Sequence, residues 1–283
     1  EMAIGLVGSE MCIRDRLAGK ELSYNNYNDM FASLEILESL GKETGTVIIK
    51  HANPCGVSKN KNPIESFKNA FACDPLSAFG GVVACNFKIN EKIASEVSKN
   101  FLEVILAKGF EKNSLNILKR KKNLRIIDIS GYKSKNITSI KNFEGAFLVQ
   151  NKDKIILDRK KLKCVTKLKP SKKELNEIEF TFNVSKYVKS NAIVLCNNFS
   201  TIGIGAGQPS RFDSCKIAIQ KAKKFQPQKI KNSIAASDAF FPFIDGVEAL
   251  IKAGVKIIIQ PGGSIKDQEV INCANKGKVK MLF

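Results

Sequence analysis

The first candidate for a catalytic residue in this sequence is a single histidine. His51 is the only histidine in the chain and directly follows Lys50, within the run IIKHANPCGVS (48–58). An imidazole can act as a general base or acid near neutral pH, and an adjacent ammonium can stabilise a developing negative charge. Neighbouring strand residues point to opposite faces, so both side chains reach one site only where the strand has ended, which Asn-Pro-Cys-Gly favours. We interpret the pair as a candidate acid–base site at a strand end; the alternative is a purely structural histidine.

Three further loops lie beside predicted strands, where open α/β folds gather their ligands. They are CDPLSAFGG (73–81), IGIGAGQPSR (202–211) and SDAFFPFIDG (237–246), and QPGGS (260–264) follows the last. The glycine loop matches neither the dinucleotide nor the P-loop fingerprint, so alone it indicates only a strand-to-helix turn. The aromatic residues around Pro242 form either a core plug or the apolar wall of a pocket for a flat ring.

The surroundings of His51 differ from those of a zinc deaminase, whose signature is H-x-E followed by P-C-x-x-C. Ala and Asn follow His51 where the signature has its glutamate, Cys55 has no cysteine three residues on, and no second histidine exists. We therefore expect no zinc. The eight cysteines form no C-x-x-C pair, which predicts reduced and mostly buried thiols.

The composition predicts a globular protein of the cytoplasm. Hydrophobic residues make up 43% of the 283, but no window approaches the roughly 18 consecutive apolar residues of a membrane span. The formal charge of +19 raises the possibility of a basic RNA-binding protein, yet very few of the 46 basic residues are arginine, the residue that nucleic-acid recognition favours. We expect no nucleic acid and no membrane as partner, and an anionic small molecule as substrate.

The elements that must position these loops alternate between apolar runs and amphipathic segments, which predicts an α/β fold. Between 131 and 170 the periodicity weakens, so we predict two lobes on either side of it. The predicted strands are 46–50, 81–85, 103–107, 124–129, 192–196, 201–204, 233–237 and 255–260, and the predicted helices are 28–40, 64–72, 91–100, 171–189, 210–224, 245–253 and 267–276.

The first sixteen residues fit nothing that follows. Leu6 to Arg16 reads as the translation of a nucleotide string resembling the end of a transposon-based sequencing adapter. We expect residues 1–16 to be foreign to the gene and leave them out of the reasoning about the fold.

Seven strings together resemble the transformylase part of the AICAR transformylase / IMP cyclohydrolase family. They are GKELSYNN (19–26), KHANPCGV (50–57), DPLSAFGG (74–81), VKSNAIVL (188–195), IGIGAGQPSR (202–211), SDAFFPF-x-DG (237–246, where x is Ile244) and IQPGGS (259–264). The resemblance implies two tandem lobes similar to cytidine deaminase but without zinc, at 17–165 and 166–283, in an intertwined homodimer. The implied reaction moves the formyl group of the co-substrate 10-formyltetrahydrofolate to the 5-amino group of AICAR, in the synthesis of IMP and other purines.

The resemblance also assigns roles to individual residues, with Arg211 as the one arginine near the site. Ile244 departs from the family, which usually has arginine there, and this puts part of the polarity on the folate side in doubt. The implied catalytic residues are His51, Lys50 and Asn191; the implied substrate-binding residues are Asn26, Phe79, Gly80 and Glu103; the implied folate-binding residues are Arg211, Phe212, Phe240, Pro242 and Phe243.

Family motifs expected before Leu17 and after Phe283 are missing from the sequence. We therefore expect a chain truncated at both ends, without the cyclohydrolase domain and without the arginines that hold the AICAR phosphate. For this fragment itself we expect a partly retained folate pocket, a weakened nucleotide site and little or no turnover. Three alternatives stay open: a basic RNA-binding protein, a zinc-dependent nucleoside deaminase, and a zinc-free deaminase-like fragment that binds nucleotide without activity.

Overall fold

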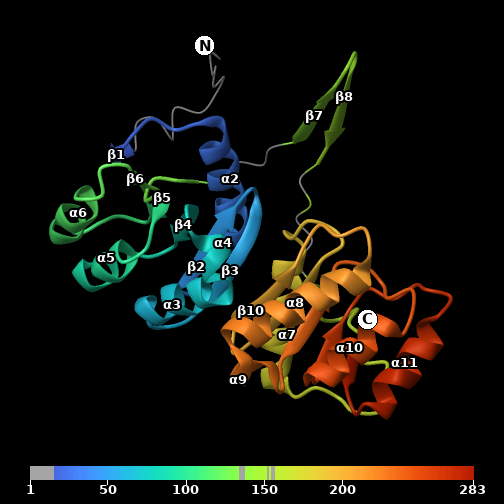
Figure 1. The fold of residues 1–283 in the computed structure, drawn as a ribbon. Coiled ribbons are helices and arrows are strands. Elements are labelled where there is room, and N and C mark those ends of the chain that lie inside the picture. Colours follow the sequence, from blue (N-terminus) through green and yellow to red (C-terminus); the bar gives the residue numbers. More distant parts are fainter. Residues whose placement is uncertain (1–15, 134–137, 152, 154–156) are drawn as a thin grey trace.

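The strands of the described chain form one large mixed sheet and one separate hairpin (Figure 1). The structure is a computed structural model, and it describes residues 16–133, 138–151, 153 and 157–283. The predicted foreign stretch lies outside the described residues except for Arg16. The strands are β1 (Arg16–Ala18), β2 (Gly45–Lys50), β3 (Asn53–Lys59), β4 (Gly81–Cys85), β5 (Leu102–Ala107), β6 (Arg125–Asp128), β7 (Ser139–Phe143), β8 (Ala146–Gln150), β9 (Ile193–Asn197), β10 (Ser200–Gly205), β11 (Ile234–Ser237), β12 (Ile257–Ile259) and β13 (Lys280–Leu282).

Helices cover both faces of the large sheet. One face carries α2 and α7, and the other carries α3, α5, α6, α8, α10 and α11. The helices are α2 (Tyr24–Ser39), α3 (Pro63–Cys73), α4 (Pro75–Ala78), α5 (Glu91–Ser98), α6 (Lys112–Lys119), α7 (Lys172–Ser185), α8 (Arg211–Phe225), α9 (Pro227–Ile230), α10 (Asp245–Ala253) and α11 (Asp267–Lys276).

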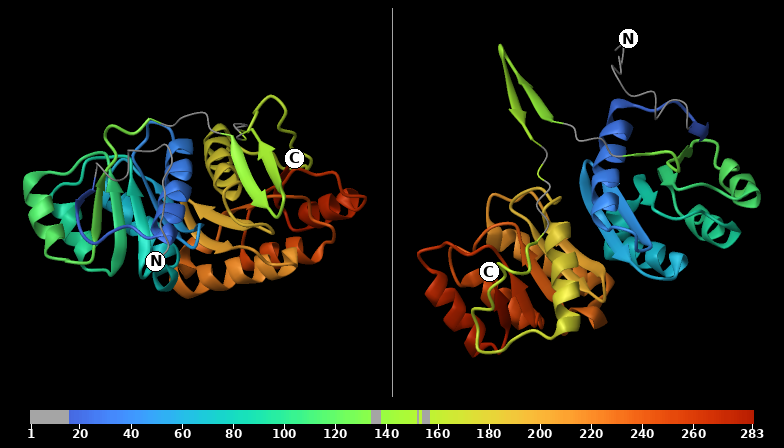
Figure 2. Two further views of the ribbon diagram at one scale, coloured as in Figure 1. Left: turned by 90° about the horizontal axis from the view of Figure 1, so that it is seen from above. Right: turned by 180° about the vertical axis from the view of Figure 1, so that it is seen from behind.

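The sheet consists of two halves with the same topology. Its order is β1-β6-β5-β4-β2-β3-β10-β9-β11-β12-β13, so the series β3, β2, β4, β5, β6 corresponds to β10, β9, β11, β12, β13. In each half an antiparallel hairpin is followed by one strand antiparallel to it and two strands parallel to that one. The halves meet where β3 pairs antiparallel with β10, and they lie side by side in Figure 2.

A bulge recurs at the same place in the two central hairpins, and next to it each hairpin has a glycine on which a helix packs closely. The register shifts after the pair Ile48–Gly56 in one hairpin and next to the pair Leu195–Gly203 in the other. A Cβ on Gly56 would lie 1.8 Å from the carbonyl oxygen of Ala70, and a Cβ on Gly203 would lie 2.2 Å from that of Ala218. Because any side chain would collide there, glycine is what allows α3 and α8 to pack directly on the strands.

The core follows the pleat of the strands. In β2 the side chains of Val47 and Ile49 join the cluster under α2 and α7, while Ile48 between them joins the cluster under α3 and α5. Since α2 and α7 contribute to one continuous cluster, this face of the core spans both halves. Burial on both faces accounts for the almost uninterrupted apolar composition of these strands.

The structure confirms the α/β class, and most predicted elements lie within a few residues of their predicted bounds. Strand β3 was not predicted, because Pro54 and Gly56 read as a turn although the strand accommodates them. Helix α2 begins at Tyr24 and not at 28, since Ser23 caps it in a capping box with Asn26. None of the helices in the described part of the chain is both long and apolar enough to cross a membrane.

The weakly periodic region between the halves contains the β7–β8 hairpin. All residues of both strands are exposed, including Ile140, Phe147 and Val149, and the hairpin projects away from the large sheet (Figure 1). Since every residue is exposed, the hairpin has no packing partner within the described chain. An isolated two-stranded hairpin is at best marginally stable in water.

Candidate functional site

Every predicted site residue lies at one edge of the large sheet. This edge is where β2 ends and, because β4 is antiparallel to β2 and β5 is parallel to β4, where β4 and β5 begin. In the second half, β9 begins there and β10 and β11 end there. The topology therefore brings together loops that are more than a hundred residues apart in the sequence.

Lys50 and His51 lie at the tight turn between β2 and β3. His51 and Ala52 both have left-handed backbone angles, with φ of 54° and 56°, so the strand has ended as the sequence required. The His51 side chain is exposed. The Lys50 ammonium donates a hydrogen bond of 2.6 Å to the carbonyl oxygen of Phe79, which places it at the bend before Gly80. An exposed imidazole next to a fixed ammonium is an arrangement suited to proton transfer with charge stabilisation.

The turn of His51 is held by Asp29, a residue that the sequence reasoning missed. The Asp29 carboxylate accepts hydrogen bonds from the backbone N–H groups of His51, at 3.1 Å, and Ala52, at 2.7 Å. Asp29 lies on α2 and is only 9% exposed. The available signal was a carboxylate on the buried side of an amphipathic helix, where it needs a partner.

Asn26 and Glu103 form a second group at the same edge. The Asn26 amide nitrogen donates to the Glu103 carboxylate at 2.8 Å, and a guanidinium nitrogen of Arg125 lies 3.9 Å from the same oxygen. Arg211 is therefore not the one arginine near the predicted site residues. Sequence reasoning missed Arg125 because it belongs to strand β6, which lies far from the four loops in the sequence.

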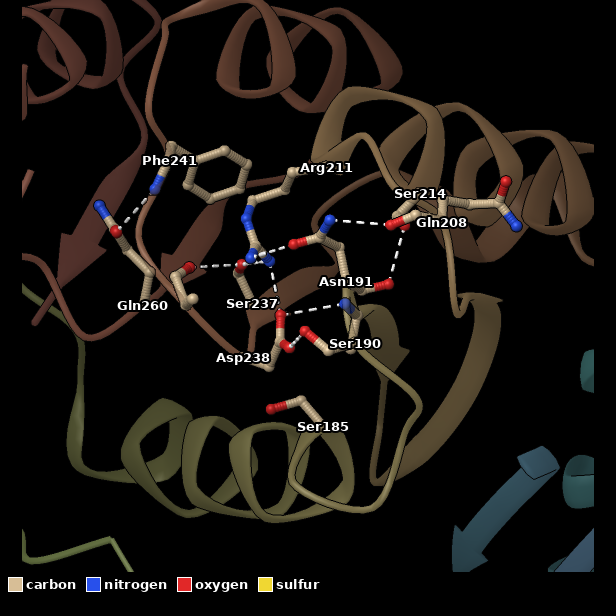
Figure 3. A network of polar contacts seen from close by, with 12 residues as sticks. Ser185, Ser190, Asn191, Gln208, Arg211, Ser214, Ser237, Asp238, Phe241 and Gln260 are labelled. Carbon is tan, nitrogen blue, oxygen red and sulfur yellow. Dashed lines mark hydrogen bonds and ion pairs between the residues drawn. The ribbon is translucent and has the colours of Figure 1, made fainter. Parts of the chain in front are cut away.

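Asn191 and Arg211 belong to a polar network in the second half (Figure 3). The guanidinium of Arg211 donates to Asn191 Oδ1 and to Asp238 Oδ1, both at 2.5 Å, and to Ser237 Oγ at 2.8 Å. The side chain of Arg211 is only 9% exposed. Its hydrogen bonds are thus directed into the protein, at a point where the resemblance suggested contact with folate.

Asp238 completes this network and was also missed. It accepts hydrogen bonds from the Ser190 hydroxyl at 2.5 Å and from the Ala192 N–H at 3.0 Å. Burial raises the pKa of the Asp238 carboxyl, but these hydrogen bonds and the charge of Arg211 together lower it by a larger amount. The pKa therefore lies below its ordinary value. The carboxylate stays ionised at neutral pH and holds Arg211 in place.

The aromatic residues of the SDAFFPF loop divide between a core plug and an exposed apolar surface. Phe241 is buried and serves as the core plug, with its N–H donating to Gln260 Oε1 at 3.1 Å (Figure 3). Phe240 and Phe243 are 41% and 62% exposed, with Pro242 between them. Two exposed aromatic rings beside a polar network could hold a flat heteroaromatic ligand.

The groups of the two halves are linked directly at this edge. The backbone N–H of Lys189 donates to Asn53 Oδ1 at 2.9 Å, which ties the His51 turn to the segment before Asn191. Phe212, on α8 next to Arg211, lies under the ammonium of Lys216 at 4.1 Å from its ring centroid. Within the described residues, no three His, Cys, Asp or Glu side chains gather as a metal ion would require.

Comparison with known proteins identifies relatives that match most of the chain. The sequence model of the family described as "AICARFT/IMPCHase bienzyme" matches residues 7–221. That match begins inside the stretch predicted to be foreign, whose origin stays a prediction. A protein of Thermoanaerobacter sp. (strain X514) named "Bifunctional purine biosynthesis protein PurH" is 47% identical over 270 residues, which are 95% of this chain and 52% of the relative.

Two further relatives of the same printed name show a similar coverage. The protein of Bartonella bacilliformis is 44% identical and that of Aquifex aeolicus (strain VF5) is 42% identical, each over 94% of this chain and 52% of the relative. The chain thus spans about half the length of the curated relatives it matches.

Proposed function

Because the chain belongs to the AICARFT/IMPCHase bienzyme family, we propose that it carries out formyl transfer from 10-formyltetrahydrofolate to the 5-amino group of AICAR, a step in purine biosynthesis. The observation that carries this proposal is the turn that places Lys50 and His51 together at the site edge. An aromatic amine is a weak nucleophile and must lose a proton as it attacks the formyl carbon. The His51 imidazole would accept that proton as general base.

Lys50 would stabilise the oxyanion of the tetrahedral intermediate. One of its three N–H donors is used by the Phe79 carbonyl, which leaves the ammonium fixed in position with donors to spare. Collapse of the intermediate would then transfer the formyl group and release tetrahydrofolate. In this reaction Asn191 would accept a hydrogen bond from the substrate, since its amide nitrogen is engaged by two main-chain carbonyls.

The two substrates would occupy the two halves of the edge. For AICAR we propose the first half, where Asn26 and Glu103 offer a polar pair and Phe79 is exposed beside Gly80. For the folate we propose the second half, at the apolar surface of four residues: Phe212, Phe240, Pro242 and Phe243. Arg211 would act there through Asn191 and Asp238, because its donors are already engaged by them.

The remaining features of the resemblance are part of this proposal. Each half of the sheet would be a cytidine-deaminase-like lobe without zinc, at 17–165 and 166–283. The protein would act in the cytoplasm as a homodimer, and the second subunit would cover the exposed β7–β8 hairpin, whose apolar side chains have no cover within the described chain.

Titration calorimetry with AICAR and with a non-reactive folate analogue, together with a formyl-transfer assay, tests the proposed function. We expect saturable binding of the folate analogue and competition for the site by 10-formyltetrahydrofolate. Binding of arbitrary RNA that weakens steeply with salt, with no binding of either small molecule, would support the RNA-binding alternative instead. Stoichiometric zinc, together with loss of activity on chelation, would support the deaminase.

A further inference from the structure

The turn that carries His51 has a backbone conformation that its residues do not favour. Two-residue hairpin turns with both central residues left-handed are ordinarily Asn-Gly or Gly-Gly. Here the central residues are His51 and Ala52, with φ of 54° and 56°. Something outside the hairpin must hold this turn, and the two hydrogen bonds to the Asp29 carboxylate are the contacts that do so.

The second half of the protein contains a turn of the same conformation, at a position away from every predicted site residue. Asn198 and Phe199 form the turn between β9 and β10, with φ of 51° and 54°. Their backbone N–H groups hydrogen-bond to the carboxylate of Glu177. Glu177 is the sixth residue of α7, as Asp29 is the sixth of α2, and serine capping boxes begin both helices.

The two turns lie at opposite edges of the sheet because β3 and β10 are antiparallel. The Glu177 turn therefore lies away from every predicted site residue, next to Lys59, whose N–H donates to the carbonyl oxygen of Phe199. A carboxylate that holds a hairpin turn is thus a repeated element of this fold. What distinguishes the Asp29 copy is that its turn bears the histidine.

We propose that Asp29 is a positioning residue that fixes the backbone of the His51 turn and thereby directs the imidazole toward the site; the catalytic part of this inference rests on the proposed function. Asp29 acts only through the two backbone N–H groups. An asparagine in its place keeps one acceptor oxygen but turns an NH₂ group toward a backbone donor, so the two-point hold is lost.

The chain offers a direct probe, because its only histidine gives a single imidazole Cε1–H signal in an NMR spectrum. The experiment compares Asp29→Asn with the matched variant Glu177→Gln, which removes the equivalent carboxylate at the opposite edge. We expect Asp29→Asn to shift, split or broaden the imidazole signal, and Glu177→Gln to leave it unchanged. An unmoved signal in Asp29→Asn would overturn the proposal.

A second variant separates positioning from folding. Ala52→Gly relieves the left-handed strain at that residue, so the double variant Asp29→Asn/Ala52→Gly should recover stability while the imidazole signal stays displaced. If the signal instead returns to its wild-type position, Asp29 only stabilises the fold and the inference is wrong.

Kinetics then connects the turn to the reaction. We expect Asp29→Asn to lower kcat for formyl transfer roughly ten- to a hundredfold with little change in KM, and Glu177→Gln to leave kcat within about twofold of wild type. Because the chain spans about half the length of its relatives, these constants are measured in a version completed to their length. No formyl transfer by that version would count against the proposed function alone, since the NMR comparison does not depend on it. An Asp29→Asn chain with a displaced signal but a wild-type kcat would contradict the catalytic part of the inference.

Discussion

The guanidinium of Arg211 and the side-chain amide of Asn191 are joined by a hydrogen bond of 2.5 Å from Nη2 to Oδ1. The amide nitrogen of Asn191 donates to the carbonyl oxygens of Gln208 and Pro209, at 2.8 Å and 2.9 Å. Both of its N–H groups are therefore in use, and the free capacity of the amide is one acceptor lone pair. Arg211 fixes which atom of Asn191 a substrate would meet.

Arg211→Lys tests this relationship. A lysine keeps the charge but cannot reach Asn191, Ser237 and Asp238 with one planar fork, so at least one buried partner loses its donor. We expect the free energy of unfolding to fall by about 1–3 kcal/mol, measured by urea denaturation. The matched control is Arg159→Lys, whose partner Glu179 and whose own side chain lie nearer the surface, and which we expect to cost at most about 1 kcal/mol. Equal losses in the two variants would contradict the role given to Arg211.

Asp238→Asn should make the free energy of unfolding less dependent on pH in the acidic range. The pKa of Asp238 lies below its ordinary value of 3.8, since its hydrogen bonds outweigh the effect of burial. Such a carboxyl stabilises the fold above its unfolded pKa and loses this contribution as the pH falls through its folded pKa. The wild type should therefore exceed Asp238→Asn in stability at neutral pH, and the difference should shrink below about pH 3.8. Urea denaturation across this range measures the difference; Asp213→Asn, at an exposed ion pair with Lys216, should show no comparable trend.

The fold was largely predictable from the sequence, because buried strands and amphipathic helices leave clear periodic patterns. The periodic pattern alone did not reveal that the two halves share a topology, which only the family resemblance implied, since they share a backbone arrangement without sharing the residues that make it. Gly56 and Gly203 are identical, but Asp29 corresponds to Glu177 and the pair His51–Ala52 to Asn198–Phe199. The correspondence between the two halves is therefore visible in their hydrogen bonds and not in their amino-acid sequences.

The candidate site was predictable only where residues are chemically unusual in their segment. A lone histidine beside a lysine and a glycine loop attract notice, and both lie at the site edge. Asp238 and Arg125 do not stand out, because acidic and basic residues at strand ends are common. Their significance depends on contacts with Arg211 and Glu103, which only the arrangement of the strands brings about.

In a version of the gene completed to the length of its relatives, His51→Ala should lower kcat for formyl transfer far more than it changes KM. Proton removal occurs in the transition state, and general-base catalysis typically contributes about a hundred- to ten-thousandfold. The matched control is Asn198→Ala, at the equivalent position of the other hairpin turn, which we expect to leave kcat within about twofold of wild type. A kcat unchanged by His51→Ala would remove the imidazole from the mechanism.

The cysteines should differ in their reaction with an alkylating reagent. Cys164 and Cys273 are partly exposed, although burial raises the pKa of Cys273 as well. Burial raises the pKa of Cys55, Cys73 and Cys215 to about 12. Since the thiolate is the reactive form, mass spectrometry of the folded chain should find alkylation at the first two and not at the last three. All five should react after unfolding in urea. Early modification of Cys73 in the folded chain would show that the end of helix α3 opens far more readily than its burial implies.

Charge placed on one face of the β7–β8 hairpin should prevent the proposed homodimer from forming. Paired residues of an antiparallel hairpin share a face, so Ile140 and Val149 lie together with Phe147 on one side, while Gln150 points to the other. This apolar face is exposed within the chain, and a lysine on it would have to be desolvated against a second subunit. We expect light scattering after size-exclusion chromatography to find a dimer for the wild type and for Gln150→Lys, and a monomer for Val149→Lys. A dimer that survives Val149→Lys, or a wild-type monomer, would mean that this face of the hairpin does not hold two subunits together.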